Sequence, residues 1–260
     1  MAMQLVQVNM KALDEVALGR FWAAALGWRS SSEGPGVINL EPEGFTWPDP
    51  AAVCVDIVVS PEPKTARNRV RLELSTTSVA HHAELVARLE GLGATPVDIG
   101  QTADRDGEAE QPGNGARDVP SRMLADPEGN EFSVQQPLEI YRDIGPIGAV
   151  VVDCADPQTM ARFWSAAVDW TVHEATDDHA LLRSAKDVGP YLRFVRTLEP
   201  KVVWNRVHLD VAPFRGNDRA PGMDRLRTLG ATDIDLGDTE VAWSVMADPE
   251  GNEFCVLGRS

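Results

Sequence analysis

Cysteine is scarce in this chain of 260 residues, which has three, at Cys54, Cys154 and Cys255. They lie far apart, and no two of them form a CxxC pair. An odd, widely spaced set of this kind argues against both a disulfide framework and a zinc knuckle. We therefore expect three free thiols.

Positively charged residues and long apolar runs are also scarce. The 24 Lys and Arg residues stand against 40 Asp and Glu, which gives a formal net charge of -16. This charge repels nucleic acid and anionic membrane surfaces, and no basic cluster offsets it. No segment approaches the ~20 apolar residues that span a bilayer, and the N-terminus lacks the pattern of a signal peptide. We expect a cytoplasmic monomer or homodimer whose partner is a small molecule.

What the chain does have is an exact internal repeat. The octapeptide ADPEGNEF occupies residues 125–132 and again 247–254. This duplication predicts two domains, residues 1–139 and 144–260. Within each copy, Pro at the second turn position and Gly at the fourth fit a type I turn, and apolar residues flank it on both sides. The motif is therefore predicted to be a hairpin between two antiparallel strands.

Each half begins with a short alternating strand followed by an amphipathic helix. Asp14 and Asp156 are suitable N-caps for the two helices, and Pro157 suits the first helical position. Apolar residues recur with helical spacing, which predicts packing of the Phe-Trp pairs in the core rather than an aromatic ligand box. These positions are Leu18, Phe21, Trp22 and Ala25, then Met160, Phe163, Trp164 and Ala167. The polar, acidic segment 101–118 is predicted to be a surface loop, with a lid over a pocket as the alternative.

Several segments together resemble one known superfamily. They are FWAAALGW, FWSAAVDW, NRVHLDV, LGAT in both halves, and VMADPEGNEFCVL. This pattern is similar to the vicinal oxygen chelate superfamily, which includes glyoxalases, bleomycin resistance proteins and extradiol dioxygenases. The resemblance covers almost the whole chain and implies an α+β fold. It implies two tandem glyoxalase-like domains, each a pair of βαβββ modules that form a curved mixed sheet around a pocket.

The central strand of each half should carry polar residues into that pocket. Val207, Leu209 and Val211 alternate along one strand and must face the helices, so His208 and Asp210 face the other way. Arg71 and Glu73 are the corresponding pair in the first half. A ligand role and a structural role in buried ion pairs both remain open for these residues.

The resemblance also implies where metal ligands would lie, on the first, fourth, fifth and eighth strands. The first half offers Gln7, Arg71 and Ser133 at three of these positions, and the second offers Ala149, His208 and Cys255. Neither half completes the usual triad, which favours a site without a metal cofactor. The alternative is a composite set for zinc, nickel or iron that joins Gln7 and Asp56 to His208 and Cys255.

Other candidate ligand-binding residues surround this position. Trp204 and Trp243 are close by in sequence, on strands expected to form the pocket, and could supply an aromatic wall, together with Arg71, Glu73 and Cys255. Cys255 would be a nucleophile if His208 lowered the pKa of its thiol, and a buried inert thiol otherwise.

Two classes of function follow from this reading. The first is a protein that binds or transforms an aromatic or polycyclic metabolite or antibiotic without a metal, with His208 and Asp210 as catalytic residues. The alternative is a metal-dependent lyase, isomerase or dioxygenase of the glyoxalase type, which uses the composite ligand set.

Overall fold

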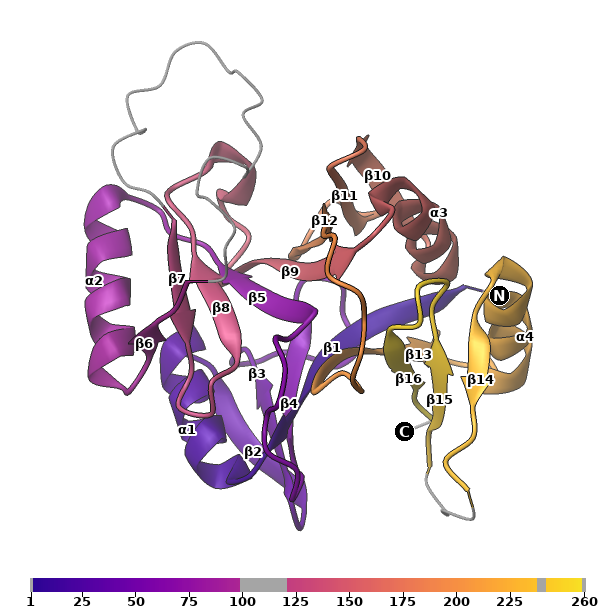
Figure 1. The fold of residues 1–260 in the computed structure, drawn as a ribbon, viewed down its shortest axis with the longest axis horizontal. Helices are drawn as coiled ribbons and strands as arrows, with labels where there is room; N and C mark the ends of the chain where they lie inside the picture. The colour runs from indigo at the N-terminus through magenta and orange to yellow at the C-terminus, as the bar shows by residue number, and fades with distance from the viewer. Residues whose placement is uncertain (1, 99–120, 238–241, 259–260) are drawn as a thin grey trace.

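The computed structural model describes residues 2–98, 121–237 and 242–258, so the segment 101–118 lies outside the described residues. The described chain consists of four βαβββ modules (Figure 1). The first contains β1 (Met3–Ala12), α1 (Glu15–Leu26), β2 (Arg29–Gly34), β3 (Val37–Glu41) and β4 (Cys54–Val59). The second contains β5 (Val70–Leu74), α2 (Val79–Gly91), β6 (Thr95–Pro96), β7 (Arg122–Ala125) and β8 (Glu131–Val134).

The second half repeats this order after a short linker with one 3-10 turn, η2 (Glu139–Tyr141). The third module contains β9 (Ile147–Cys154), α3 (Pro157–Val168), β10 (Trp170–Ala175), β11 (His179–Ser184) and β12 (Tyr191–Arg196). The fourth contains β13 (Val207–Pro213), α4 (Arg219–Leu229), β14 (Thr232–Ile234), β15 (Ser244–Ala247) and β16 (Glu253–Val256). The α+β class with two mixed sheets is therefore confirmed. None of the described helices is long and apolar enough to cross a membrane.

Each sheet combines one module from each half of the sequence. Sheet A has the strand order β14-β15-β16-β13-β1-β4-β3-β2, and so joins the first module to the fourth. Sheet B has the order β10-β11-β12-β9-β5-β8-β7-β6, and joins the second module to the third. The ranges 1–139 and 144–260 thus describe the sequence repeat, whereas each sheet crosses from one range to the other. This corrects the expectation that each half closes a pocket with its own strands.

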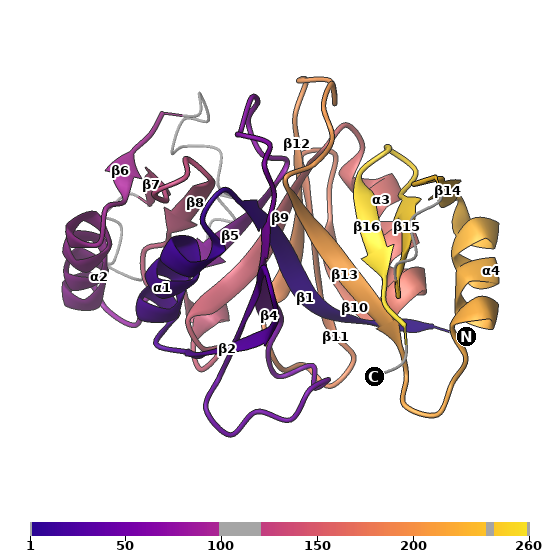
Figure 2. The same cartoon turned by 90° about the horizontal axis from the view of Figure 1, so that it is seen from below.

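The junctions in both sheets are antiparallel strand pairs between the halves. In sheet A, β1 pairs with β13, and in this register Asn9 lies opposite His208. In sheet B, β5 pairs with β9, and Arg71 lies opposite Val151. Figure 2 shows β1 and β13 crossing the middle of the molecule, with α1 and α2 on one flank and α3 and α4 on the other. One continuous apolar core runs through both halves and includes the Phe-Trp pairs, as the helical spacing predicts.

The repeated octapeptide forms a hairpin in each half, as expected, and also builds a hydrogen-bonded turn. β7 pairs with β8 and β15 with β16 on either side of it. The buried Asp248 carboxylate accepts hydrogen bonds from the backbone N–H groups of Glu250 and Asn252, and the indole of Trp164 donates to it over 3.4 Å. Asp126 accepts the same bond from Trp22 at 3.0 Å. The invariant part of the repeat therefore anchors the first helix of each half to the second module of that half.

The first Glu of each repeat makes contacts with both halves of the chain. Glu128 accepts hydrogen bonds from the backbone N–H groups of Leu13 and Asp14, just before α1. The guanidinium of Arg206, which precedes β13 in the other half, forms an ion pair with the same carboxylate. Glu250 makes the equivalent contacts before α3 and lies 3.6 Å from Arg69. In each of these two ion pairs, a Glu from one half contacts an Arg from the other half. The pairs therefore connect the two halves of the chain.

Other local predictions are also confirmed. Asp14 and Asp156 cap their helices, accepting hydrogen bonds from the backbone N–H groups of Ala17 and Thr159. All three cysteines are free and buried. By contrast, Trp204 and Trp243 lie just before β13 and β15 rather than on them, and more than two-fifths of each side chain is exposed.

The crossed sheets make a direct prediction about the linker. If a protease site is inserted between the exposed residues Arg142 and Asp143, cleavage should leave the halves associated, because the β1–β13 and β5–β9 pairs would still hold them together. Size-exclusion chromatography of the cut protein should give one peak at the mass of the uncut chain. Two folded fragments of half that mass would contradict the crossed arrangement.

The Trp164–Asp248 bond predicts a pH-dependent loss of stability in Trp164→Phe. Burial raises the pKa of Asp248 to about 6, against the opposing hydrogen bonds from Asn252, Glu250 and Trp164. Loss of the indole donor should raise this folded-state pKa further above the unfolded value. The free energy of unfolding should therefore fall by about 1–3 kcal/mol at pH 8, where the carboxylate is charged, and by less at pH 5.

Urea unfolding at the two pH values measures both losses. Trp170→Phe is the matched control, because the indole nitrogen of this buried residue makes no hydrogen bond to the described part of the chain. That control should lose the same free energy at both pH values. A Trp164→Phe penalty that did not change with pH would contradict the role assigned to the hydrogen bond.

Candidate functional site

The composite set of polar residues expected from the two halves is brought together on sheet A. Gln7 comes from β1, Asp56 from β4, His208 and Asp210 from β13, and Cys255 from β16. All five side chains are buried. The neighbours Val207, Leu209 and Val211 enter the apolar core, so the predicted alternation along this strand is confirmed. The cluster exists because β1 and β13 are adjacent, and each half alone contributes only part of it.

Gln7 connects the two carboxylates of the cluster. Its side-chain amide nitrogen donates to Asp56 at 2.5 Å and to Asp210 at 3.0 Å. Asn39 on β3, which the sequence reasoning did not single out, donates to the other oxygen of Asp56 at 2.7 Å. Its position opposite Asp56 in the β3–β4 register places its amide here. The amides therefore hold both carboxylates in fixed orientations.

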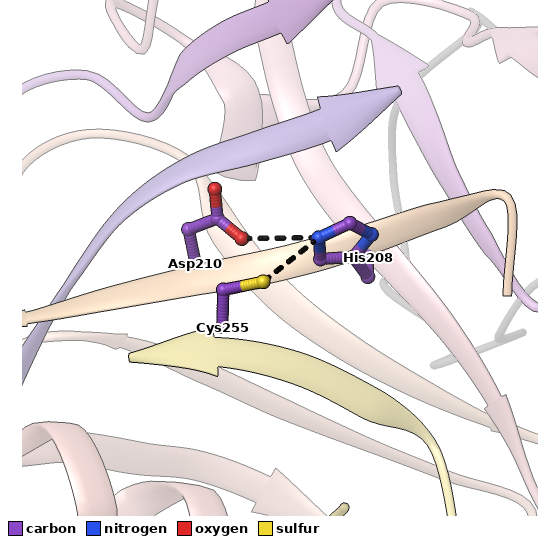
Figure 3. A group of neighbouring side chains, drawn as sticks. All are labelled: His208, Asp210 and Cys255. Atoms are coloured by element: carbon purple, nitrogen blue, oxygen red, sulfur yellow. Dashed lines mark hydrogen bonds and ion pairs between the residues drawn. The ribbon is translucent and has the colours of Figure 1, made fainter. Parts of the chain in front are cut away.

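His208 lies at the centre of the other side of the cluster. Its Nε2 atom is 3.3 Å from Asp210 Oδ1 and 3.3 Å from Cys255 Sγ (Figure 3). The Oδ1 atom of Asp210 is buried and near this nitrogen, but the two are not aligned for a hydrogen bond. His208 Nδ1 is also buried and has no hydrogen-bond partner among the described residues. The nitrogen, oxygen and sulfur atoms of these three residues all lie within 4.8 Å of one another.

The thiol of Cys255 is electrostatically disfavoured as an anion. Burial, and then the nearby Asp210 carboxylate, raise the pKa of this thiol, while Lys11 opposes the shift. The protein alone thus keeps Cys255 protonated at neutral pH, which removes the basis for a nucleophilic thiolate. A bound cation would reverse this balance, because a coordinated thiol loses its proton.

The equivalent positions on sheet B carry a different chemistry. Arg71 forms an ion pair with Asp153 at 2.6 Å, and Glu73 pairs with Arg193 at 3.2 Å and accepts a hydrogen bond from Tyr141. Arg71 and Glu73 are therefore occupied by internal partners, as in the structural alternative for these residues. They lie on sheet B, away from the His208 cluster on sheet A.

Part of the linker packs against sheet B. Tyr141 and Ile144 are buried in a small apolar cluster with Ala149, Val151 and Tyr191. A Cβ atom at position 148 would lie 2.8 Å from the Tyr141 ring, so Gly148 allows the ring to lie against β9. Ser133, at the eighth-strand position, accepts a hydrogen bond from Gln135 at 3.2 Å. Of the two sheets, sheet A thus carries the cluster with potential metal ligands.

Comparison with known proteins identifies the family of this chain. The family model for the glyoxalase-like domain matches residues 7–135 and 149–257, and the chain belongs to this family within the vicinal oxygen chelate superfamily. No curated protein sequence matches the chain significantly.

Among solved structures, glyoxalase I from Zea mays aligns with a TM-score of 0.64 at 12% identity, over 99% of this chain and 92% of that one. A candidate dioxygenase from Bacillus subtilis aligns with a TM-score of 0.58 at 12% identity, over 99% of this chain and 85% of its own. At these identities the similarity establishes a shared fold.

The protonation state of Cys255 can be tested by alkylation. In native protein at pH 7.5, iodoacetamide should leave Cys255 unmodified, because the thiol is buried and its pKa is raised. The buried Cys54 and Cys154 serve as internal references, and all three should react in guanidinium chloride. Mass spectrometry of tryptic peptides measures each site. Rapid modification of Cys255 alone in the folded protein would restore the nucleophile hypothesis.

Proposed function

We propose that this chain is a metal-dependent enzyme of the glyoxalase type, with one site on sheet A. Its substrate would be a small organic molecule that presents two adjacent oxygens, and the reaction class is that of a lyase, isomerase or dioxygenase. The observation that carries the proposal is the group formed by His208, Asp210 and Cys255, which offers one nitrogen, one oxygen and one sulfur ligand atom from adjacent strands.

The chemistry and spacing of these atoms suit a transition metal. Nitrogen, oxygen and sulfur donors of this kind fit zinc, nickel or iron. In a tetrahedral site with bonds of about 2.0–2.3 Å, neighbouring ligand atoms are about 3.3–3.7 Å apart. His208 Nε2 lies 3.3 Å from both Asp210 Oδ1 and Cys255 Sγ, in agreement with those spacings. The unaligned, buried Asp210 Oδ1 also favours a ligand that the protein itself does not supply.

His208, Asp210 and Cys255 would hold the metal, and Asp56 and Gln7 would border it. Bound there, the metal would polarise the two substrate oxygens as a Lewis acid. Asp210 replaces the carboxylate expected on the eighth strand, because it follows His208 by two residues and so shares its face. Gln7 and Asn39 restrain Asp56 at the edge of the cluster, where its carboxylate can accept a proton from the substrate.

A metal-free binding protein is the second candidate. It is favoured by the raised pKa of Cys255 and by the hydrogen bonds that Gln7 already makes to both carboxylates. In that case His208 and Asp210 would act on an aromatic or polycyclic metabolite directly, as an acid–base pair.

Metal analysis separates the two candidates. Tag-free protein purified from metal-supplemented culture should contain roughly one equivalent of zinc, nickel or iron, and His208→Ala should contain almost none. His179→Ala is the matched control, since that imidazole lies on sheet B, where its Nε2 is 3.1 Å from Glu174, and it should retain the metal. Binding should strengthen as pH rises, because the Cys255 proton must leave.

The result that would overturn the proposal is equally direct. The metal proposal is contradicted if the protein holds less than about a tenth of an equivalent of any transition metal, both as purified and after incubation with each ion. That result would support the metal-free candidate. Circular dichroism of His208→Ala should match that of the unchanged protein, which separates lost binding from lost folding.

A further inference from the structure

A cavity of about 120 Å³ lies at one end of the β1–β13 junction. Its walls are the segments 62–68 and 203–206, which precede β5 and β13, together with Lys11 near the end of β1. The lining is rich in basic residues in a chain of net charge -16. It also contains Trp204, whose side chain is 43% exposed and thus accessible to a ligand.

Most of the cations around this cavity are neutralised by carboxylates. Lys64 pairs with Glu131 at 2.6 Å, Arg67 pairs with Asp153 at 2.8 Å, and Arg206 pairs with Glu128. Lys11 differs from them. In the described part of the chain its ammonium makes no ion pair and instead lies 5.8 Å from the centre of the Trp204 ring.

The internal repeat shows what Lys11 and Trp204 replace. The positions equivalent to them in the other module pair are Asp153 and Arg67, which form a partly buried ion pair. On sheet B the two charges therefore cancel at this position. On the sheet A side, a cation faces an aromatic ring instead, so the positive charge is left to attract an external anion.

Lys11 is also close to the proposed active site along the strand. Asn9 lies opposite His208 in the β1–β13 register, and Lys11 follows it by two residues on the same face. That step is about 6.6 Å along a strand. A molecule of moderate size could thus contact Lys11 at one end and the His208 cluster at the other.

We propose that Lys11 and Trp204 form a recognition subsite for an anionic aromatic group of the substrate. Lys11 would bind a carboxylate, and the exposed face of Trp204 would pack against the ring that carries it. This inference rests on the proposed function, and it narrows the substrate class to small aromatic carboxylates.

Benzoate and the isosteric, neutral benzamide are suitable probes for this subsite. The seven Trp residues can be labelled with 5-fluorotryptophan, and the resonance that disappears in Trp204→Phe identifies Trp204. Benzoate should shift that resonance to saturation, and benzamide should require about ten-fold higher concentration, because a charge-assisted contact is lost. Lys11→Met should weaken benzoate binding by about ten-fold and abolish the preference over benzamide.

Two further variants make the outcome decisive. Lys186→Met removes one positive charge from an exposed turn of sheet B and should leave benzoate binding unchanged. His208→Ala should retain benzoate binding even where it loses metal, so failure of the subsite and failure of the metal proposal can be told apart. If Lys11→Met binds benzoate as tightly as the unchanged protein does, or if benzoate binding disappears in His208→Ala, the anion is bound elsewhere and the assignment to Lys11 is overturned.

Discussion

The antiparallel pairing of β1 with β13 is the contact on which the site depends. It places Asn9 opposite His208, and thereby brings Gln7 and Asp56 from the first module beside Asp210 and Cys255 from the fourth. A slip of one residue in this register would turn the polar residues of one strand into the core. The ion pair of Arg206 with Glu128 lies at one end of this junction, and the pair of Arg69 with Glu250 has the equivalent place beside β5 and β9.

Local structure was largely predictable from the sequence, because its causes lie within a few residues. The octapeptide hairpins, the Asp14 and Asp156 caps and the alternation around His208 all follow from turn chemistry and periodicity. The members of the composite site could also be proposed from the resemblance.

What the sequence could not supply was the partner of each module. Pairing β1 with β5 or with β13 would satisfy the same alternation, so only long-range packing decides between them. The Tyr141 hydrogen bond to Glu73 and the contact of Lys11 with Trp204 were missed for the same reason, since they join residues distant in the chain.

Comparison of the two sheets shows how duplication permits divergence. The two sheets have equivalent positions because the sequence is repeated. At these positions sheet B carries the Arg71–Asp153 and Glu73–Arg193 pairs, whereas sheet A carries His208 and Asp210. On sheet B, the buried Arg71 and Glu73 side chains have ion-pair partners, and Glu73 also accepts a hydrogen bond from Tyr141. On sheet A, His208 Nδ1 and Asp210 Oδ1 are buried and have no aligned hydrogen-bond partner among the described residues, which costs free energy. The two sheets therefore differ in how far their buried polar groups are satisfied by internal partners.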